Sequence, residues 1–216
     1  MTTTLRTLEL EYDRQIAHLE SIGLTGTTSL PIHSFRRQAR ALKRRLGDLV
    51  VRARPDRLPF VVVVKQQAVP MEDAMATVTI RGASGIVNMD PVVPTDFHPI
   101  NRMAIPPGDL YLLEQVESGR DTLDIRPEDA LRMIRARRRS PLTIDEGVAL
   151  VVQFPHILTD KRYFNCFQLP GSRRADQRIP SIWISYGRPR LGWCWNRNKH
   201  SWLGCASCRR RLGTDS

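Results

Sequence analysis

The sequence predicts an α+β fold: N-terminal helices, a mixed β-sheet with an inserted helical pair, and C-terminal aromatic-rich β-hairpins. Three observations predict this class. Apolar residues recur at helical spacing near the N-terminus, β-branched runs occupy the middle, and short aromatic strands separated by turn residues make up the C-terminal third. The 216 residues fit a single domain, which divides into a helical N-terminal part at 5–54, an α+β body at 58–208 and a basic tail at 209–216.

Two amphipathic helices are predicted in the N-terminal part. The apolar positions of the first recur every three or four residues, at Leu5, Leu8, Tyr12, Ile16, Leu19 and Ile22. The second follows Pro31, and its apolar stripe runs from Phe35 to Leu49. Basic residues cover the rest of the second helix: Arg36, Arg37, Arg40, Lys43 and Arg44. Such a helix can lie on nucleic acid, although a solvated outer face over a buried stripe is the more common arrangement.

The middle of the chain alternates predicted strands and helices. The continuous apolar run at 59–65 is typical of a strand buried on both faces, and the run at 110–116 predicts a second strand. The proline-rich stretch 90–109 predicts an extended loop. A helical pair follows: Pro127 stands near the start of its first helix, and Thr143 begins its second as the first residue of a capping box.

The C-terminal third is predicted to be β. The runs at 163–169, 180–186 and 191–195 are rich in aromatic and β-branched residues, and the sequence YGRPRL predicts a hairpin between the last two. Because side chains alternate along a strand, Trp193 and Trp195 share one face and Cys194 points to the other.

Charge and apolar patterning limit the cellular location and the binding partners that the sequence predicts. The net charge is +11, and basic stretches at 33–57 and 161–216 flank an acidic stretch at 58–134. An excess of positive charge attracts polyanions, so a nucleic-acid or ribosome-associated basic protein is one alternative. The sequence has no apolar run of about 18 residues, so no membrane-spanning helix is predicted. The N-terminus lacks the pattern of a signal peptide. We therefore expect a cytoplasmic protein with reduced thiols.

Cysteine and histidine spacing near the C-terminus allows two kinds of chemistry. Cys194, His200, Cys205 and Cys208 form C-x5-H-x4-C-x2-C, a full ligand set for structural zinc with one conventional C-x2-C pair. No other cofactor is expected. His200 and Cys194 are also the candidates for an enzyme of unassigned class. The chain contains no phosphate-binding loop, nucleophile elbow or metalloprotease motif.

The clustering of tryptophan is the most informative feature. All four tryptophans lie between positions 183 and 202, with amides and an imidazole between them. Aromatic faces beside polar turn residues can bind a small ligand, so we expect a non-catalytic ligand-binding or accessory domain with these pocket residues: Trp193, Trp195, Asn196, Asn198, His200, Ser201 and Trp202. The competing interpretation is that the tryptophans form the core beneath the hairpin.

Several segments together resemble a bacterial family. EYDRQIAHLESIGL, PFVVVVK, GRDTLDIRPEDAL, SPLTIDEGVALV and PSIWISYGRPRLGWCWNRNKHSWLG are similar to a mainly actinobacterial family, domain of unknown function 5701. The resemblance covers about residues 8–208. It implies one cytosolic domain and supplies no catalytic residue, cofactor or reaction. In the family pattern the position of Cys205 is usually Ser, and the strong basic charge is particular to this chain.

Overall fold

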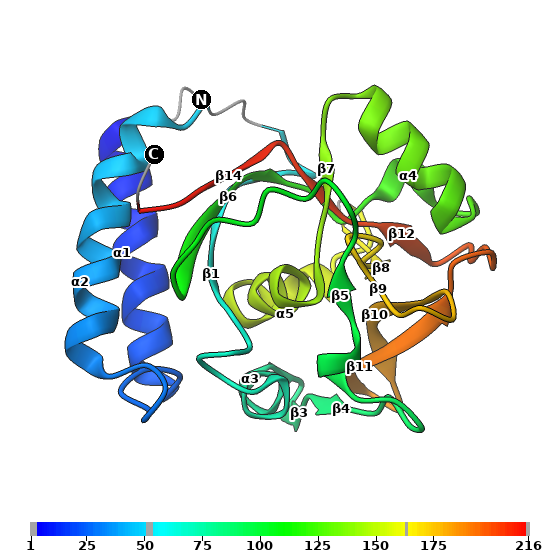
Figure 1. The fold of residues 1–216 in the computed structure, drawn as a ribbon, viewed down its shortest axis with the longest axis horizontal. Helices are drawn as coiled ribbons and strands as arrows, with labels where there is room; N and C mark the ends of the chain where they lie inside the picture. The colour runs from blue at the N-terminus through cyan, green and yellow to red at the C-terminus, as the bar shows by residue number, and fades with distance from the viewer. Residues whose placement is uncertain (1–3, 51–53, 163, 215–216) are drawn as a thin grey trace.

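A computed structural model describes residues 4–50, 54–162 and 164–214. Within these residues two larger β-sheets, of three and five strands, have helices around and between them (Figure 1), and three further sheets have two strands each. The helices are α1 Leu5–Ser21, α2 Ile32–Lys43, α3 Met71–Thr77, α4 Pro127–Ala136 and α5 Ile144–Gln153, with short 3-10 turns η1 Arg44–Asp48, η2 Pro94–Asp96, η3 Arg120–Thr122 and η4 Pro155–Leu158. The strands are β1 Leu58–Val64, β2 Thr79–Ile80, β3 Ala83–Ser84, β4 Ile86–Val87, β5 His98–Pro99, β6 Leu110–Val116, β7 Ser140–Pro141, β8 Cys166–Gln168, β9 Ser172–Arg173, β10 Arg178–Ser185, β11 Arg188–Trp195, β12 Leu203–Cys205, β13 Ser207–Cys208 and β14 Arg210–Leu212.

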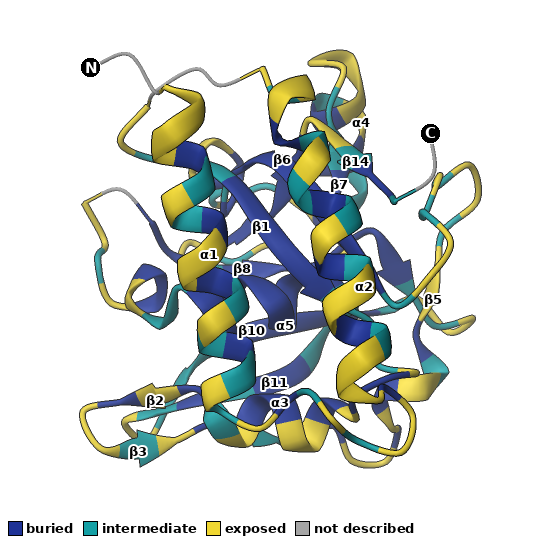
Figure 2. Ribbon diagram, turned by 90° about the vertical axis from the view of Figure 1, so that its left-hand side faces the viewer, coloured by how far each residue is buried: buried dark blue, intermediate teal, exposed yellow. Residues whose placement is uncertain are grey.

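The first sheet has three antiparallel strands in the order β1-β6-β14. Helices α1 and α2 stand side by side on one of its faces, with their buried residues toward β1 and their exposed residues outward (Figure 2). Helix α5 packs against the sheet as well, on the side away from α1 and α2 (Figure 1). Coverage of both faces explains why β1 is a continuous apolar run, as the sequence predicts.

The second sheet is mixed, in the order β12-β8-β10-β11-β4. Its β10–β11 hairpin turns at Tyr186 and Gly187, which both have a left-handed backbone (φ 48° and 78°), as a two-residue hairpin turn requires. Helix α5 lies between the two sheets, contacting β1 and β10. Its approach depends on Gly147, because a Cβ there would lie 2.4 Å from the side chain of Leu169.

The predicted α+β class is confirmed, with three differences in arrangement. The described strands form five separate sheets, of which the five-stranded one is mixed, in place of the single mixed sheet that the sequence predicts. The two helices predicted as a pair lie apart, because α5 is apolar enough to fill the space between the sheets whereas α4 packs near β7 and β12 (Figure 1). Finally, the segment predicted as a basic tail contributes strand β14, because buried Glu114 and Glu146 neutralise its arginines. Positions 51–53 of the predicted helical part and 215–216 of the tail lie outside the described residues.

The hydrophobic core runs through both sheets. One cluster of buried residues extends from Leu8 in α1 to Leu212 in β14 and includes side chains from every helix except α4. Within the part of the chain that the structure describes, no helix is both long enough and apolar enough to cross a membrane.

Candidate functional site

The tryptophans divide between the two faces of the β10–β11 hairpin. Trp193 and Trp195 stand opposite Pro180 and Arg178 and share one face, as the alternation predicts. Trp183 stands opposite Arg190, on the other face. Trp202 contacts Trp183, so the structure does not bring the three tryptophans of the predicted pocket together.

The Trp193–Trp195 face is occupied by a cation of the chain itself. The two rings meet edge to face, with centroids 5.3 Å apart. The guanidinium carbon of Arg178 lies 4.3 Å from the centroid of Trp193 and 5.0 Å from that of Trp195. The Trp193 indole N–H donates to the carbonyl of Met89. The face of this tryptophan pair therefore already holds a cation, and the Trp193 N–H already has a hydrogen-bond acceptor.

Trp202 belongs to the other group of aromatic rings. It meets Trp183 edge to face at 6.4 Å and the imidazole of His200 at 5.4 Å. Desolvation lowers the pKa of His200, so its imidazole is neutral at neutral pH. Trp202 remains 48% exposed. A large aromatic ring that stays half in solvent beside a neutral imidazole is available for contact with a ligand.

A cavity of about 560 Å³ adjoins Trp202, and we call it the aromatic cavity. Its apolar walls are Leu123, Leu158, Phe164, Ile184 and Trp202. Its polar lining is Arg120, Lys161, Asn165, Cys166 and Ser201. Of the predicted pocket residues, only Ser201 and Trp202 line it, and His200 meets Trp202 edge to face. The sequence predicts Phe164, Asn165 and Cys166 only as part of a strand at 163–169, and no local pattern marks Leu158 or Lys161.

The two predicted amides lie outside the aromatic cavity. Asn196 is buried and structural: its backbone N–H donates to Gln177, and its side-chain oxygen accepts from Arg173. Asn198 is exposed, and its backbone N–H closes a turn onto the carbonyl of Trp195.

The four predicted zinc ligands do not converge. Cys205 Sγ lies 3.7 Å from the side-chain oxygen of Gln168, Cys208 sits in β13 opposite Ser140, and His200 packs on Trp202. Burial raises the pKa of every cysteine, to about 12 for Cys205 and Cys208, so each thiol is protonated at neutral pH: Cys166, Cys194, Cys205 and Cys208. Among the residues described here, no three His, Cys, Asp or Glu side chains are placed to hold one metal ion.

The basic helix α2 is partly neutralised by its neighbour. Arg36 pairs with Glu20 at 2.9 Å and Lys43 with Asp13 at 2.7 Å, both acids belonging to α1. The other three cations of the predicted nucleic-acid surface are exposed: Arg37, Arg40 and Arg44. Charge on α2 is therefore partly matched within the fold.

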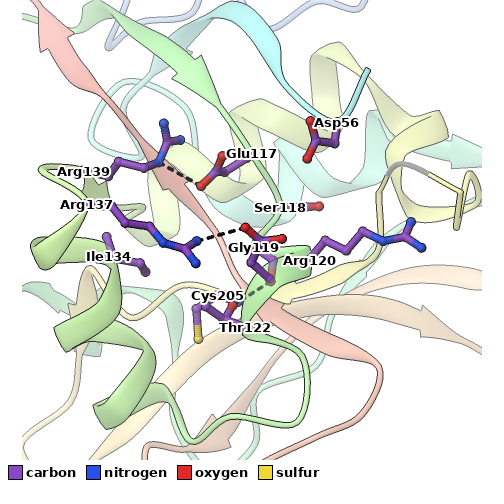
Figure 3. Close-up of a pocket in the computed structure, with 11 residues that line it drawn as sticks. Asp56, Glu117, Ser118, Gly119, Arg120, Thr122, Ile134, Arg137, Arg139 and Cys205 are labelled. Atoms are coloured by element: carbon purple, nitrogen blue, oxygen red, sulfur yellow. Dashed lines mark hydrogen bonds and ion pairs between the residues drawn. The ribbon is translucent and has the colours of Figure 1, made fainter. Parts of the chain in front are cut away.

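A second hollow, of about 620 Å³, is lined by arginines from three separated segments. We call it the arginine basin, and its arginines are Arg54, Arg57, Arg137, Arg138, Arg139 and Arg209. Glu117 and Asp121 also line it: Glu117 pairs with Arg139 (Figure 3), and Asp121 pairs with Arg137 at 3.0 Å. The basin joins the two basic stretches of the sequence in space. The basic run 135–139 is visible in the sequence, but its position at the C-terminal end of a helix, where the helix dipole favours positive charge, is a sufficient local explanation for it.

The turn η3 separates the arginine basin from the aromatic cavity. Gly119 precedes η3 with φ 82°, and a Cβ there would lie 2.1 Å from the carbonyl oxygen of Cys205, so only glycine fits this approach. The recess beside it in Figure 3 has room of about 10 Å³, enough for no more than a water molecule. Arg120 of η3 lines the aromatic cavity, and Asp121 lines the basin.

Comparison with known proteins places the chain in a family. Residues 18–214 match the profile of a family of unknown function, DUF5701. No curated protein and no solved structure was found to match the chain. Because the match spans nearly the whole chain, including both hollows, the protein belongs to the DUF5701 family.

Proposed function

We propose that this protein is a binding protein for a small amphipathic organic anion, held in the aromatic cavity. The observation that carries the proposal is the cavity itself, whose volume of about 560 Å³ falls in the usual range for small-ligand sites. Ligand sites of this kind combine apolar walls with a few polar groups that orient the ligand.

The walls favour an apolar body for the ligand. Trp202 and Phe164 supply aromatic surface, and Ile184 supplies branched aliphatic surface. Trp202 keeps about half of its surface in solvent, so a ligand that covered it would remove apolar area from water. This contact would contribute a large part of the binding free energy.

The polar lining favours a negative charge on the ligand. Arg120 and Lys161 both line the cavity, and no carboxylate does among the described lining residues. Arg120 is fixed in position because its guanidinium donates to the backbone carbonyls of Lys161 and Arg162. The Lys161 ammonium is exposed and can move onto a carboxylate or sulfonate.

Binding without covalent chemistry is favoured by the state of the cavity's thiol. Cys166 is the only cysteine that lines the cavity, and burial raises the pKa of its thiol. A protonated thiol is a poor nucleophile. Asn165, next to it, is engaged by the hydroxyl of Ser118 at 3.0 Å. Neither group is arranged to activate a substrate.

Binding of 1-anilinonaphthalene-8-sulfonate tests the proposal, because this probe is an apolar anion that fluoresces when it leaves water. We expect one site per chain and a dissociation constant at least about tenfold higher in Trp202→Ala. The matched control is Trp195→Ala, which removes a 40%-exposed tryptophan from the opposite face and should leave the constant unchanged.

A second pair of variants tests the charge. Lys161→Met should weaken binding of the sulfonate probe more than binding of its uncharged analogue N-phenyl-1-naphthylamine. Lys199→Met, at an exposed lysine paired with Asp124, should change the binding of neither probe. Circular dichroism checks that each variant is folded, since this probe also binds partly unfolded proteins. Equal losses in Trp202→Ala and Trp195→Ala would refute the proposed site.

A further inference from the structure

We propose that the arginine basin is a second, separate site that binds an oligophosphate group, the size of a diphosphate or triphosphate. The guanidinium groups come from three segments, at 54–57, 137–139 and 209, and face one hollow. Guanidinium groups bind phosphate oxygens through paired hydrogen bonds, which makes arginine the preferred residue for recognising phosphate.

The charges around the basin leave an excess that an anion can neutralise. Among its described lining residues, six arginines face two carboxylates, Glu117 and Asp121. Two further carboxylates reach in from outside: Asp56 pairs with Arg54, and Glu114 pairs with Arg209. Glu114 also binds Arg210, so four carboxylates face seven arginines. The described residues around the basin do not supply enough negative charge for these cations.

Two of the arginines form a fixed floor. Arg139 is 8% exposed, forms an ion pair with Glu117 and donates to Ser207 and the carbonyl of Gln115. Arg57 is 15% exposed and donates to the same Glu117. Burial, together with the positive charges of Arg57 and Arg137, lowers the pKa of Arg139 although Glu117 opposes this. A bound anion would relieve this crowding of like charges.

The remaining arginines are available at the rim. Arg137 makes an ion pair of 3.0 Å with Asp121, but both side chains are about half exposed or more, at 45% and 61%. Exposed pairs of this kind contribute little and exchange readily for a stronger partner. Arg138 makes no side-chain hydrogen bond or ion pair within the part of the chain that the structure describes. Its guanidinium is free to bind a ligand.

The backbone at Arg138 is an independent indication. Helix α4 ends with the N–H of Arg139 on the carbonyl of Ile134 and the N–H of Arg138 on that of Arg135. This is the pattern of a Schellman cap, in which the left-handed residue is usually glycine. Arg138 occupies that residue with φ 55°. A strained arginine in place of glycine is a reason to look for a function of its side chain.

The size and shape of the hollow select the class of anion. A volume of about 620 Å³ exceeds what one phosphate fills, and arginines from three chain segments that line one hollow suit a compact, multiply charged group. An extended nucleic-acid strand would instead use a surface stripe of cations. The proposal therefore concerns a phosphate-bearing small molecule, and it does not depend on the aromatic cavity binding a ligand.

Isothermal titration calorimetry of the full chain with sodium tripolyphosphate, at low ionic strength, tests the proposal. We expect one site, weakened about tenfold or more by Arg137→Gln and by Arg138→Gly. The matched control is Arg132→Gln, which removes the same charge from an exposed ion pair on the same helix, outside the basin. It should change the affinity less than about twofold.

Further ligands identify the source of the phosphates. A nucleoside triphosphate that binds at least as tightly as tripolyphosphate supports the proposal and indicates a nucleotide-like ligand. Absence of tripolyphosphate binding overturns the proposal, and so does an equal loss in Arg132→Gln and Arg137→Gln, which would indicate general charge attraction. Binding of a single-stranded RNA oligonucleotide without binding of tripolyphosphate also overturns it. None of these results bears on the aromatic cavity.

Discussion

Glu146 of α5 and Arg211 of β14 form a doubly hydrogen-bonded ion pair inside the protein, with side chains 0% and 5% exposed. The same carboxylate accepts the backbone N–H of Thr143 at 2.8 Å, completing the capping box, and the hydroxyl of Tyr111 at 2.9 Å. One side chain therefore joins the helix between the sheets to two strands of the first sheet. This is why a basic C-terminal segment ends as a strand.

Removing the charge of Glu146 should destabilise the fold strongly. Glu146→Gln keeps the shape but leaves the buried guanidinium of Arg211 without its counter-ion, which costs about 3–5 kcal/mol in comparable pairs. Urea denaturation measures this as a lower free energy of unfolding. Glu11→Gln, which breaks an exposed pair with Arg14, is the control and should cost less than about 1 kcal/mol. Similar losses in the two variants would contradict the interpretation.

Replacing Arg138 by glycine should leave the fold as stable or make it more stable. A left-handed backbone costs a non-glycine residue about 1–2 kcal/mol, and glycine's greater freedom in the unfolded chain offsets about half of this. We therefore expect a gain of up to about 1 kcal/mol in the free energy of unfolding. Arg135→Gly, in the last turn of α4, should instead destabilise by about 1 kcal/mol. A clear loss of stability in Arg138→Gly would show that its side chain supports the fold.

Local signals in the sequence were sufficient for most secondary structure. The capping box at Thr143 and the helix-start proline at Pro127 each mark a helix that the structure contains. The apolar run that became β1 indicated burial on both faces. These features depend on neighbours within a few residues, so the sequence displays them directly.

The arrangement of the candidate sites depended on pairs that are distant in sequence. Alternation along β11 placed Trp193 and Trp195 together, but only the register with β10 shows Trp183 on the opposite face. The basin brings Arg57 and Arg139 to one carboxylate, Glu117, across 60 and 22 positions of the chain. A periodic pattern in the sequence does not indicate that residues so far apart lie together, so both hollows could be identified only from the fold.

The cysteines should react slowly in the folded protein, and the protein should not carry stoichiometric zinc. Burial raises the pKa of every thiol, and the thiolate is both the nucleophile and the zinc ligand. At neutral pH we expect a maleimide to label half-buried Cys166 and Cys194 before buried Cys205 and Cys208, with all four labelled quickly in denaturant. Elemental analysis of untagged protein checks the metal. One zinc per chain, lost in Cys208→Ser, would contradict the geometry.

Acid should destabilise the fold partly through His200. Desolvation lowers the pKa of its imidazole in the folded protein, and its Nε2 is buried without a hydrogen-bond partner among the described residues. Above about pH 6.5, the ordinary histidine value, folded and unfolded chains both hold it neutral. As the pH falls below that value the unfolded chain binds the proton first, so stability is lost until the pH passes the lowered pKa.

The drop in Tm between about pH 7.5 and about pH 5.5 measures this contribution. We expect a smaller drop in His200→Asn than in the unsubstituted protein, because the variant has no imidazole to protonate against Trp202. His33→Asn, at an exposed histidine in α2, controls for general effects of charge and should leave the drop unchanged. An equal drop in His200→Asn would mean that solvent screens this imidazole fully. The ring beside the aromatic cavity would then be protonated as readily in the folded protein as in the unfolded chain.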